Sequence, residues 1–137
     1  MAKPKVAFLC VHNACRSQMA QALGQHFAAD VFESYSAGTA PAAQIQPDAV
    51  RILRALYGID MLRDGQTPKL LAALPPVDIV VAMGCNVQCP ALPCRRRMDW
   101  GLEDPTGKGD EAFISTAKAI EQNIKALRAA LSADMQA

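Results

Sequence analysis

Lys5-Val-Ala-Phe-Leu-Cys10-Val-His-Asn-Ala-Cys15-Arg16-Ser17-Gln18-Met19-Ala20 is the stretch that decides the fold. Residues 6–9 form a short apolar run suited to a buried parallel strand, and residues 17–23 open a helix. The turn between them follows the carboxyl end of the strand, where open parallel sheets place their ligands. We therefore expect a strand, a turn and a helix that together form a binding site.

The turn itself has the composition of an anion-binding site. Its backbone N–H groups can surround a tetrahedral oxyanion, and the positive end of the following helix adds to the attraction. Arg16 supplies a planar guanidinium that fits two oxygens of one anion. The predicted oxyanion-binding residues are Val11, His12, Asn13, Ala14, Cys15, Arg16 and Ser17.

Cys10 is predicted to lie at the base of this turn. The N–H groups, Arg16 and the helix end would all favour the thiolate over the thiol there, and a thiolate that faces phosphorus or arsenic is a nucleophile. Ser17 can donate its hydroxyl to the Cys10 sulfur or cap the helix. Asn13 tolerates left-handed backbone and is expected to hold the shape of the loop. We expect Cys15 to be packed rather than redox-active.

The bulk composition narrows the class of protein. The 137 residues are enough for one domain, which we assign to residues 1–137. A formal net charge of +1 argues against binding to nucleic acid or to a membrane surface. Because no apolar run has the form of a signal peptide or a membrane span, we expect a cytoplasmic protein. In that reducing compartment, five cysteines indicate catalysis, redox chemistry or metal binding rather than a disulfide framework.

Strand and helix patterns alternate along the rest of the chain. After a helix at about residues 17–28, we predict a strand at 31–36, a helix from Pro47 to Gly58, a short helix at 69–73, a buried strand at 77–83, a short strand at 95–100, and a final helix whose apolar stripe covers 113–131. This order predicts an α/β fold, namely a single-domain three-layer sandwich with a central four-stranded parallel sheet flanked by helices.

Asp104-Pro105 is a candidate for the acid that such a site needs. Removing an oxygen from a tetrahedral oxyanion requires a proton for the leaving group, and a carboxyl on a proline-fixed loop can supply it. Aspartate before proline is equally typical of a turn in which the carboxylate accepts hydrogen bonds. The residues alone leave both interpretations open.

Three more cysteines lie in the proline-bounded stretch after the strand at 77–83: Cys85, Cys89 and Cys94. We expect this stretch at the same sheet edge as the Cys10 turn, since it follows the carboxyl end of a parallel strand. Cys85 and Cys89 are four positions apart, so on a helical turn they would share one side and could form a disulfide after a modest adjustment. Alternatively, the three thiols ligate zinc or are packed bystanders, and Cys94 could take the place of Cys89.

The segment Cys10-Val-His-Asn-Ala-Cys-Arg16-Ser17 resembles the anion-binding loop shared by low-molecular-weight protein tyrosine phosphatases and the arsenate reductases built on the same fold. The resemblance to the thioredoxin-coupled arsenate reductases continues through Ser36-Ala-Gly38 and the Cys85 and Cys89 stretch to Asp104-Pro105. Gln18 is also similar to the reductases, because the phosphatases usually carry proline at that position.

The resemblance implies a reaction and a set of roles. Arg16 and the loop amides would hold arsenate, Cys10 would attack it, and Asp104 would act as the acid. Cys85 would then attack the Cys10 sulfur as arsenite leaves, and Cys89 would complete a disulfide that thioredoxin reduces. No bound cofactor or metal is implied, and we expect a monomer.

Other functions stay open at this point. A low-molecular-weight phosphatase would use Cys10, Arg16 and Asp104 without needing Cys85 or Cys89. A non-catalytic thiol sensor or a metal-binding module is a third class. Glutaredoxin or a small thiol could replace thioredoxin as the reductant.

Overall fold

A computed structural model describes residues 3–84 and 94–136. Its elements follow the alternating order predicted from the sequence. They are β1 (Lys5–Cys10), α1 (Arg16–Phe27), β2 (Glu33–Gly38), α2 (Pro47–Tyr57), the 3-10 helix η1 (Leu71–Ala73), β3 (Ile79–Ala82), β4 (Arg96–Asp99) and α3 (Asp110–Gln136).

The four strands form one parallel sheet in the order β2-β1-β3-β4. Cys10 pairs with Gly38 across β1 and β2, while Leu9 pairs with Ala82 of β3. Because all strands run the same way and are in register, their carboxyl ends meet at one edge. This edge carries the turn after Cys10, as predicted.

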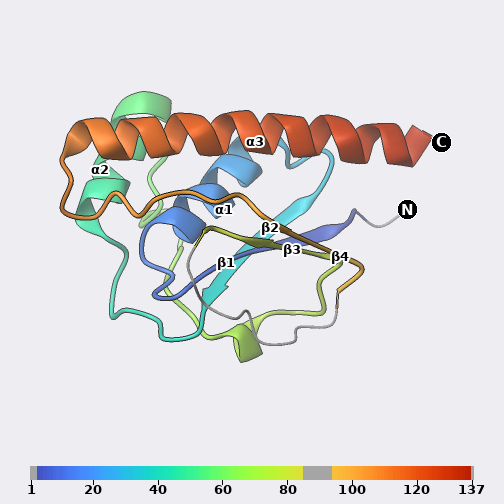
Figure 1. The fold of residues 1–137 in the computed structure, drawn as a ribbon, viewed down its shortest axis with the longest axis horizontal. Coiled ribbons are helices and arrows are strands. Elements are labelled where there is room, and N and C mark those ends of the chain that lie inside the picture. Colours follow the sequence, from blue (N-terminus) through green and yellow to red (C-terminus); the bar gives the residue numbers. More distant parts are fainter. Residues whose placement is uncertain (1–2, 85–93, 137) are drawn as a thin grey trace.

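Side chains on the two faces of the sheet form separate cores. The larger core lies between the sheet and the helices α1, α2 and α3, and includes Phe8 and Val81. The smaller one packs Leu9 and Val80 against Leu71 and Leu74, on and beside η1. Figure 1 shows α3 crossing the molecule over the other helices, with η1 beyond the strands. The predicted three-layer sandwich is therefore confirmed, although within residues 3–84 and 94–136 one outer layer holds only a single 3-10 turn.

The helices owe their bounds to local chemistry. The Gln46 side chain caps α2 by accepting from the Asp48 N–H at 2.5 Å, Pro47 occupies the first turn, and Gly58 ends the helix at φ +70°. In α3 the predicted apolar stripe is confirmed. All six members are at most 6% exposed: Phe113, Ala117, Ile120, Ile124, Leu127 and Leu131.

The second strand begins two residues later than predicted. The N–H groups of Val31 and Phe32 both donate to the carbonyl of Ala28, at 2.9 and 3.0 Å, so the first part of the expected strand is a turn closing α1. Pairing with β1 therefore starts at Glu33. In the described part of the chain, no helix is both long enough and apolar enough to cross a membrane.

Candidate active site

Cys10 is the last residue of β1 and is 7% exposed. Its Sγ lies 2.8 Å from Oγ of Ser17, in the first turn of α1. The strand, the turn and the helix thus bring the thiol and the hydroxyl together across seven residues of sequence. This is one of the two arrangements that the sequence predicts for Ser17.

The backbone of residues 11–15 is oriented by hydrogen bonds from the segment 40–46. The bonds are Ala40 N–H to Val11 O at 2.9 Å, Ala42 N–H to His12 O at 2.9 Å and Gln46 N–H to Ala14 O at 2.8 Å. In a trans peptide the C=O and N–H groups point to opposite sides. Because these carbonyls face outward, the N–H groups that follow them face the inside of the loop. Within the described residues, no N–H of 11–17 donates to a backbone carbonyl.

Gly38 is required because the loop packs directly on the end of β2. A Cβ at this position would lie 2.5 Å from the Val11 oxygen and 2.9 Å from the Cys10 oxygen. Both contacts are with backbone atoms, which cannot rotate away. The absence of a side chain at Gly38 therefore fixes how closely the loop approaches the sheet.

Asn13 holds the loop from within. It has a φ of +49°, the only positive φ among the described non-glycine residues, so the predicted left-handed conformation is confirmed. Its side chain is fully buried, donates to Ser17 Oγ at 2.7 Å and accepts from the Lys69 N–H at 2.9 Å. Asn13 thus links the loop, the start of α1 and the segment before η1.

Arg16 is 9% exposed and fixed at the same sheet edge. Its Nη1 donates to the carbonyl of Met83 at 2.9 Å and to that of Leu102 at 2.8 Å. Within the described residues, these are the hydrogen bonds of the guanidinium. They anchor one of its nitrogens after β3 and β4 and thereby set the plane of the whole group.

Asp104 adopts the turn that was one of its two predicted roles. Its Oδ1 accepts from the Thr106 N–H at 3.0 Å and from the Thr106 hydroxyl at 2.8 Å. Burial raises the pKa of Asp104, but these hydrogen bonds and the charges of Arg16 and His12 lower it more, so its pKa lies below the ordinary value. The carboxylate is therefore near the loop and ionised at neutral pH.

The other cysteines differ in what they can do. Burial, with Asp104 and Cys10 adding to it, raises the pKa of Cys15 to about 12, which fits the predicted packed thiol.

Cys94 packs with the smaller core and comes just before β4 in the chain. Arg96, the first residue of β4, is in register with Ile79 at the start of β3. Cys94 thus lies at the amino ends of the strands, about 20 Å along the sheet from Cys10.

Our expectation that Cys94 lies at the same edge as the Cys10 turn is therefore wrong. The chain between β3 and β4 has to return to the opposite edge before a second parallel strand can begin. Cys85 and Cys89 lie outside the described residues.

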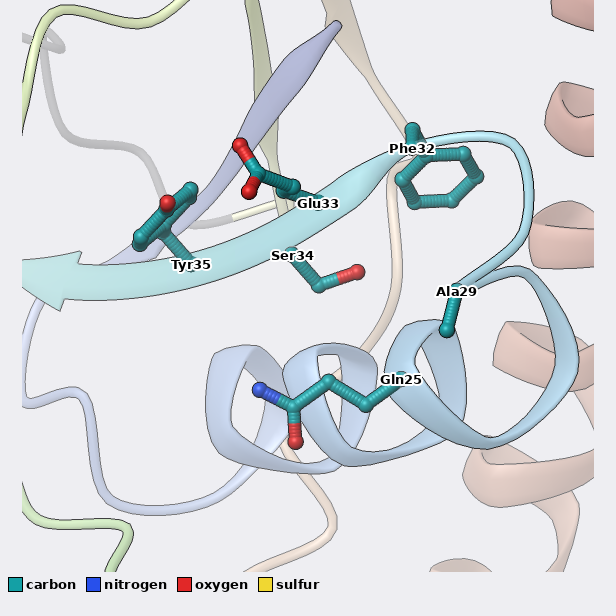
Figure 2. Close-up of a pocket in the computed structure, with 6 residues that line it drawn as sticks. All are labelled: Gln25, Ala29, Phe32, Glu33, Ser34 and Tyr35. Atoms are coloured by element: carbon teal, nitrogen blue, oxygen red, sulfur yellow. The ribbon is translucent and has the colours of Figure 1, made fainter. Parts of the chain in front are cut away.

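A cavity of about 280 Å³ lies elsewhere, between the end of α1 and the start of β2. Figure 2 shows Ser34 and Gln25 on the same side of β2, while Glu33 and Tyr35 lie on the other side of the strand. Because Glu33 starts β2 and Gly38 ends it, this cavity is at the sheet edge opposite the Cys10 loop. It is not part of the Cys10 loop.

The sequence pattern of the low molecular weight phosphotyrosine protein phosphatase family matches residues 5–137. The chain belongs to this family. It is 35% identical over 128 residues to an arsenate reductase of Bacillus cereus strain G9842, with 90% of this chain and 92% of the relative covered.

Solved structures resemble this phosphatase-family chain closely. An arsenate reductase in its phosphate-binding state has a TM-score of 0.83 at 29% identity, covering 93% of this chain and 98% of that one. A thioredoxin-dependent arsenate reductase of Corynebacterium glutamicum has a TM-score of 0.76 at 34% identity, covering 96% of this chain and 63% of that one. A low molecular weight protein tyrosine phosphatase from T. tengcongensis, at 24% identity and a TM-score of 0.76, shares the fold. The predicted family resemblance and fold class are confirmed.

The residues that support the loop from outside were not predicted from the sequence. Gln66 and Lys69 reach the loop region from the segment between α2 and η1, and their bonds to Gln18 and Asn13 span 48 and 56 positions of the chain. The only sequence pattern in that segment is the helix-breaking pair Gly65 and Pro68. This pair predicts a loop between two helices but not that the loop contacts the Cys10 turn. Gln18 was noted for its resemblance to the reductases, but its buried side chain also bonds to both oxygens of Asn13.

Proposed function

We propose that this chain reduces arsenate to arsenite, with Cys10 as the nucleophile. The observation that carries the proposal is the Cys10 sulfur 2.8 Å from the Ser17 hydroxyl, beneath a loop whose carbonyls are turned outward. Relatives that cover nine-tenths of the chain are named arsenate reductases, and one solved neighbour is named for its phosphate-binding state. Phosphate and arsenate share shape and charge, so the same loop suits both.

The loop binds the oxyanion through N–H groups of residues 11–17 and through Arg16. Since Nη1 of Arg16 is held by the carbonyls of Met83 and Leu102, we assign Nε and Nη2 to the arsenate oxygens. The positive end of α1 faces the same space and adds to the attraction. These donors are in place before the anion arrives, so little reorganisation opposes binding.

In the first step the Cys10 sulfur forms a bond to arsenic while one arsenate oxygen leaves as water. The Cys10 thiolate, dihydrogen arsenate and one proton thus give a Cys10–S–AsO₃H⁻ adduct and one water, and arsenic is still pentavalent. The leaving oxygen needs a proton, which we assign to Asp104. The negative charge of bound arsenate repels the nearby carboxylate charge and so favours the protonated form of Asp104.

In the second step Cys85 attacks the Cys10 sulfur. An S–S bond forms, the S–As bond breaks, and its electron pair leaves with arsenic as arsenite, H₂AsO₃⁻. Cys89 then attacks Cys85 and releases Cys10, and thioredoxin reduces the resulting Cys85–Cys89 disulfide by exchange. The thioredoxin-dependent neighbour from Corynebacterium glutamicum supports this choice of reductant.

The test is arsenate-dependent oxidation of NADPH in the presence of thioredoxin and thioredoxin reductase. Cys10→Ser, Cys85→Ser and Cys89→Ser should each abolish turnover, whereas Cys94→Ser, at the opposite sheet edge, is the matched control and should keep the wild-type rate. Full activity of Cys10→Ser would refute the nucleophile. Normal turnover of Cys89→Ser with thioredoxin would refute the relay.

A phosphatase is the second candidate function, because the family match and the oxyanion loop serve phosphate esters equally well. It would act through Cys10, Arg16 and Asp104. In that case hydrolysis of p-nitrophenyl phosphate would be efficient and would survive Cys85→Ser and Cys89→Ser, while wild-type protein would show no arsenate-dependent NADPH oxidation.

A further inference from the structure

Four hydrogen bonds connect Gln66 to the sulfur of Cys10, 56 positions earlier in the chain. Gln66 Nε2 donates to Gln18 Oε1 at 2.8 Å, and Gln18 Nε2 donates to Asn13 Oδ1 at 3.1 Å. Asn13 Nδ2 donates to Ser17 Oγ at 2.7 Å, and Ser17 Oγ lies 2.8 Å from Cys10 Sγ. We call this chain of side chains the amide relay.

The direction of every amide in the relay is fixed by a main-chain group. Gln66 Nε2 also donates to the main-chain oxygen of Gln18 at 3.1 Å, and Gln18 Nε2 also donates to the main-chain oxygen of Asn13 at 3.0 Å. The Lys69 N–H donates to Asn13 Oδ1 at 2.9 Å. Rotating any of these amides by half a turn would set oxygen against oxygen or N–H against N–H.

This fixed direction decides the role of the Ser17 hydroxyl. Asn13 Nδ2 donates to Oγ, so Oγ is the acceptor in that bond. When Cys10 is a thiolate its sulfur can only accept, so the hydrogen of Ser17 Oγ then points to it. Every donor of the relay therefore points from Gln66 toward Cys10. Hydrogen bonds aligned in this way polarise one another, most strongly where water is excluded. Gln18, Asn13 and Ser17 are fully buried and Gln66 is 6% exposed.

We propose that Gln66 is a positioning residue that acts through Gln18 and Asn13 to hold the Ser17 hydroxyl toward Cys10 and so keeps the sulfur reactive. The inference rests on the proposed role of Cys10 as the nucleophile. The relay contains no ionisable side chain before Cys10, so its hydrogen bonds keep the same direction when the pH changes. It also connects the reactive sulfur to the segment between α2 and η1.

A purely structural role for Gln66 predicts something different. Gln66 Oε1 has no hydrogen-bond partner within the described residues, so methionine at this position removes an unsatisfied buried oxygen as well as a donor. If Gln66 only fills space, Gln66→Met should shift the melting temperature and leave the chemistry of Cys10 unchanged. If it acts through the relay, the reactivity of Cys10 should fall even where the fold is retained.

The experiment measures the rate of Cys10 alkylation by iodoacetamide as a function of pH on the native protein. Tryptic cleavage after Lys5 and Arg16 yields the peptide 6–16, and tandem mass spectrometry separates modification of Cys10 from that of Cys15. Cys15 reacts slowly in this range because burial raises its pKa to about 12. The readout requires neither arsenate nor thioredoxin.

The variants are Gln66→Met, Gln18→Met and the double variant, with Gln66→Leu as a second shape at the same position. Gln21→Met is the matched control, since Gln21 accepts from Ser36 at 2.5 Å and is not part of the relay. Gln66→Met should move the midpoint of the pH profile upward and lower the rate below the midpoint by about threefold, and Gln18→Met by about tenfold. The double variant should match Gln18→Met, because Gln66 acts only through Gln18.

Two results would overturn the inference. One is a pH profile of Gln66→Met and Gln66→Leu that superimposes on that of the wild type. The other is a double variant whose loss is the product of the two single losses, which would give Gln66 a separate route to the site. If wild-type protein reduces no arsenate while the profiles shift as expected, the amide relay stands and the proposed function fails.

Discussion

Replacing Gly38 with alanine tests whether the loop after Cys10 is held in place by its close packing on the end of β2. The new Cβ would lie 2.5 Å from the Val11 oxygen, where ordinary contact begins at 3.4 Å. It would also lie 2.9 Å from the Cys10 oxygen and 3.0 Å from the Asn13 nitrogen. The loop would have to retreat by 0.9 Å to relieve the first contact alone, and all three neighbours are backbone atoms.

This displacement should affect turnover more than stability. A misplacement of about 1 Å at a reacting centre can lower the rate about a hundredfold. Overpacking of a buried site costs roughly 1–3 kcal/mol of unfolding free energy, which corresponds to a melting temperature lower by roughly 3–15 °C for a domain of this size. We therefore expect Gly38→Ala to fold and to lose about two orders of magnitude in kcat/KM.

The assay is kcat/KM for arsenate in the thioredoxin-coupled reaction, with the melting temperature measured by calorimetry on the same samples. Gly58→Ala is the matched control: it has a φ of +70° but no atom within 4 Å of the added Cβ. It should lose about 1–2 kcal/mol through backbone strain and keep wild-type kcat/KM. If Gly38→Ala stays within threefold of wild-type kcat/KM, the reasoning about loop packing is wrong.

Three further predictions concern the site. Asp104→Asn keeps an oxygen that can accept from Thr106, so it should lower kcat about a hundredfold if Asp104 is the acid and leave kcat unchanged if the residue only shapes the turn. Ser17→Ala should slow alkylation of Cys10 at pH 7 by about tenfold, because a hydrogen bond to a charged sulfur is lost; an unchanged rate would contradict the assignment of that bond. Burial raises the pKa of Cys15 from 9.0 to about 12, so the folded protein holds this proton more tightly than the unfolded chain does. Its contribution to stability is complete below pH 9.0 and is lost as pH rises toward 12. Urea denaturation between pH 10 and 11 should therefore show a loss of ~1.4 kcal/mol per pH unit from this group, and Cys15→Ala should show a shallower dependence than wild type.

Local patterns in the sequence were sufficient to predict the architecture. The apolar run before Cys10, the stripe along α3, and Pro47 and Gly58 at the ends of α2 each specify an element through its own neighbours. Alternation of such elements then leaves a parallel sheet as the arrangement that buries all of them. The bounds of β2 were less predictable, because the Ala28 carbonyl takes two N–H groups that an extended strand would have offered to β1.

The candidate site was predictable where its parts are neighbours in the chain. Cys10, Asn13, Arg16 and Ser17 fall within eight residues, so a strand, a turn and a helix of known geometry place them together. The place of Cys94 in the fold could not be predicted from its separation from Cys89 along the sequence. It depends on where the chain crosses back to start β4, and that places Cys94 at the opposite edge of the sheet.

The sequence by itself determined the identity of the sulfur, the guanidinium and the turn that presents them, because short-range backbone geometry is encoded by adjacent residues. Only the tertiary structure decided that Gly38 must lack a side chain, that carbonyls after β3 and β4 fix Arg16, and that Gln66 donates into the loop. These contacts join residues that are 25 to 86 positions apart. They exist only once the two cores have packed and brought the carboxyl ends of the strands to one edge.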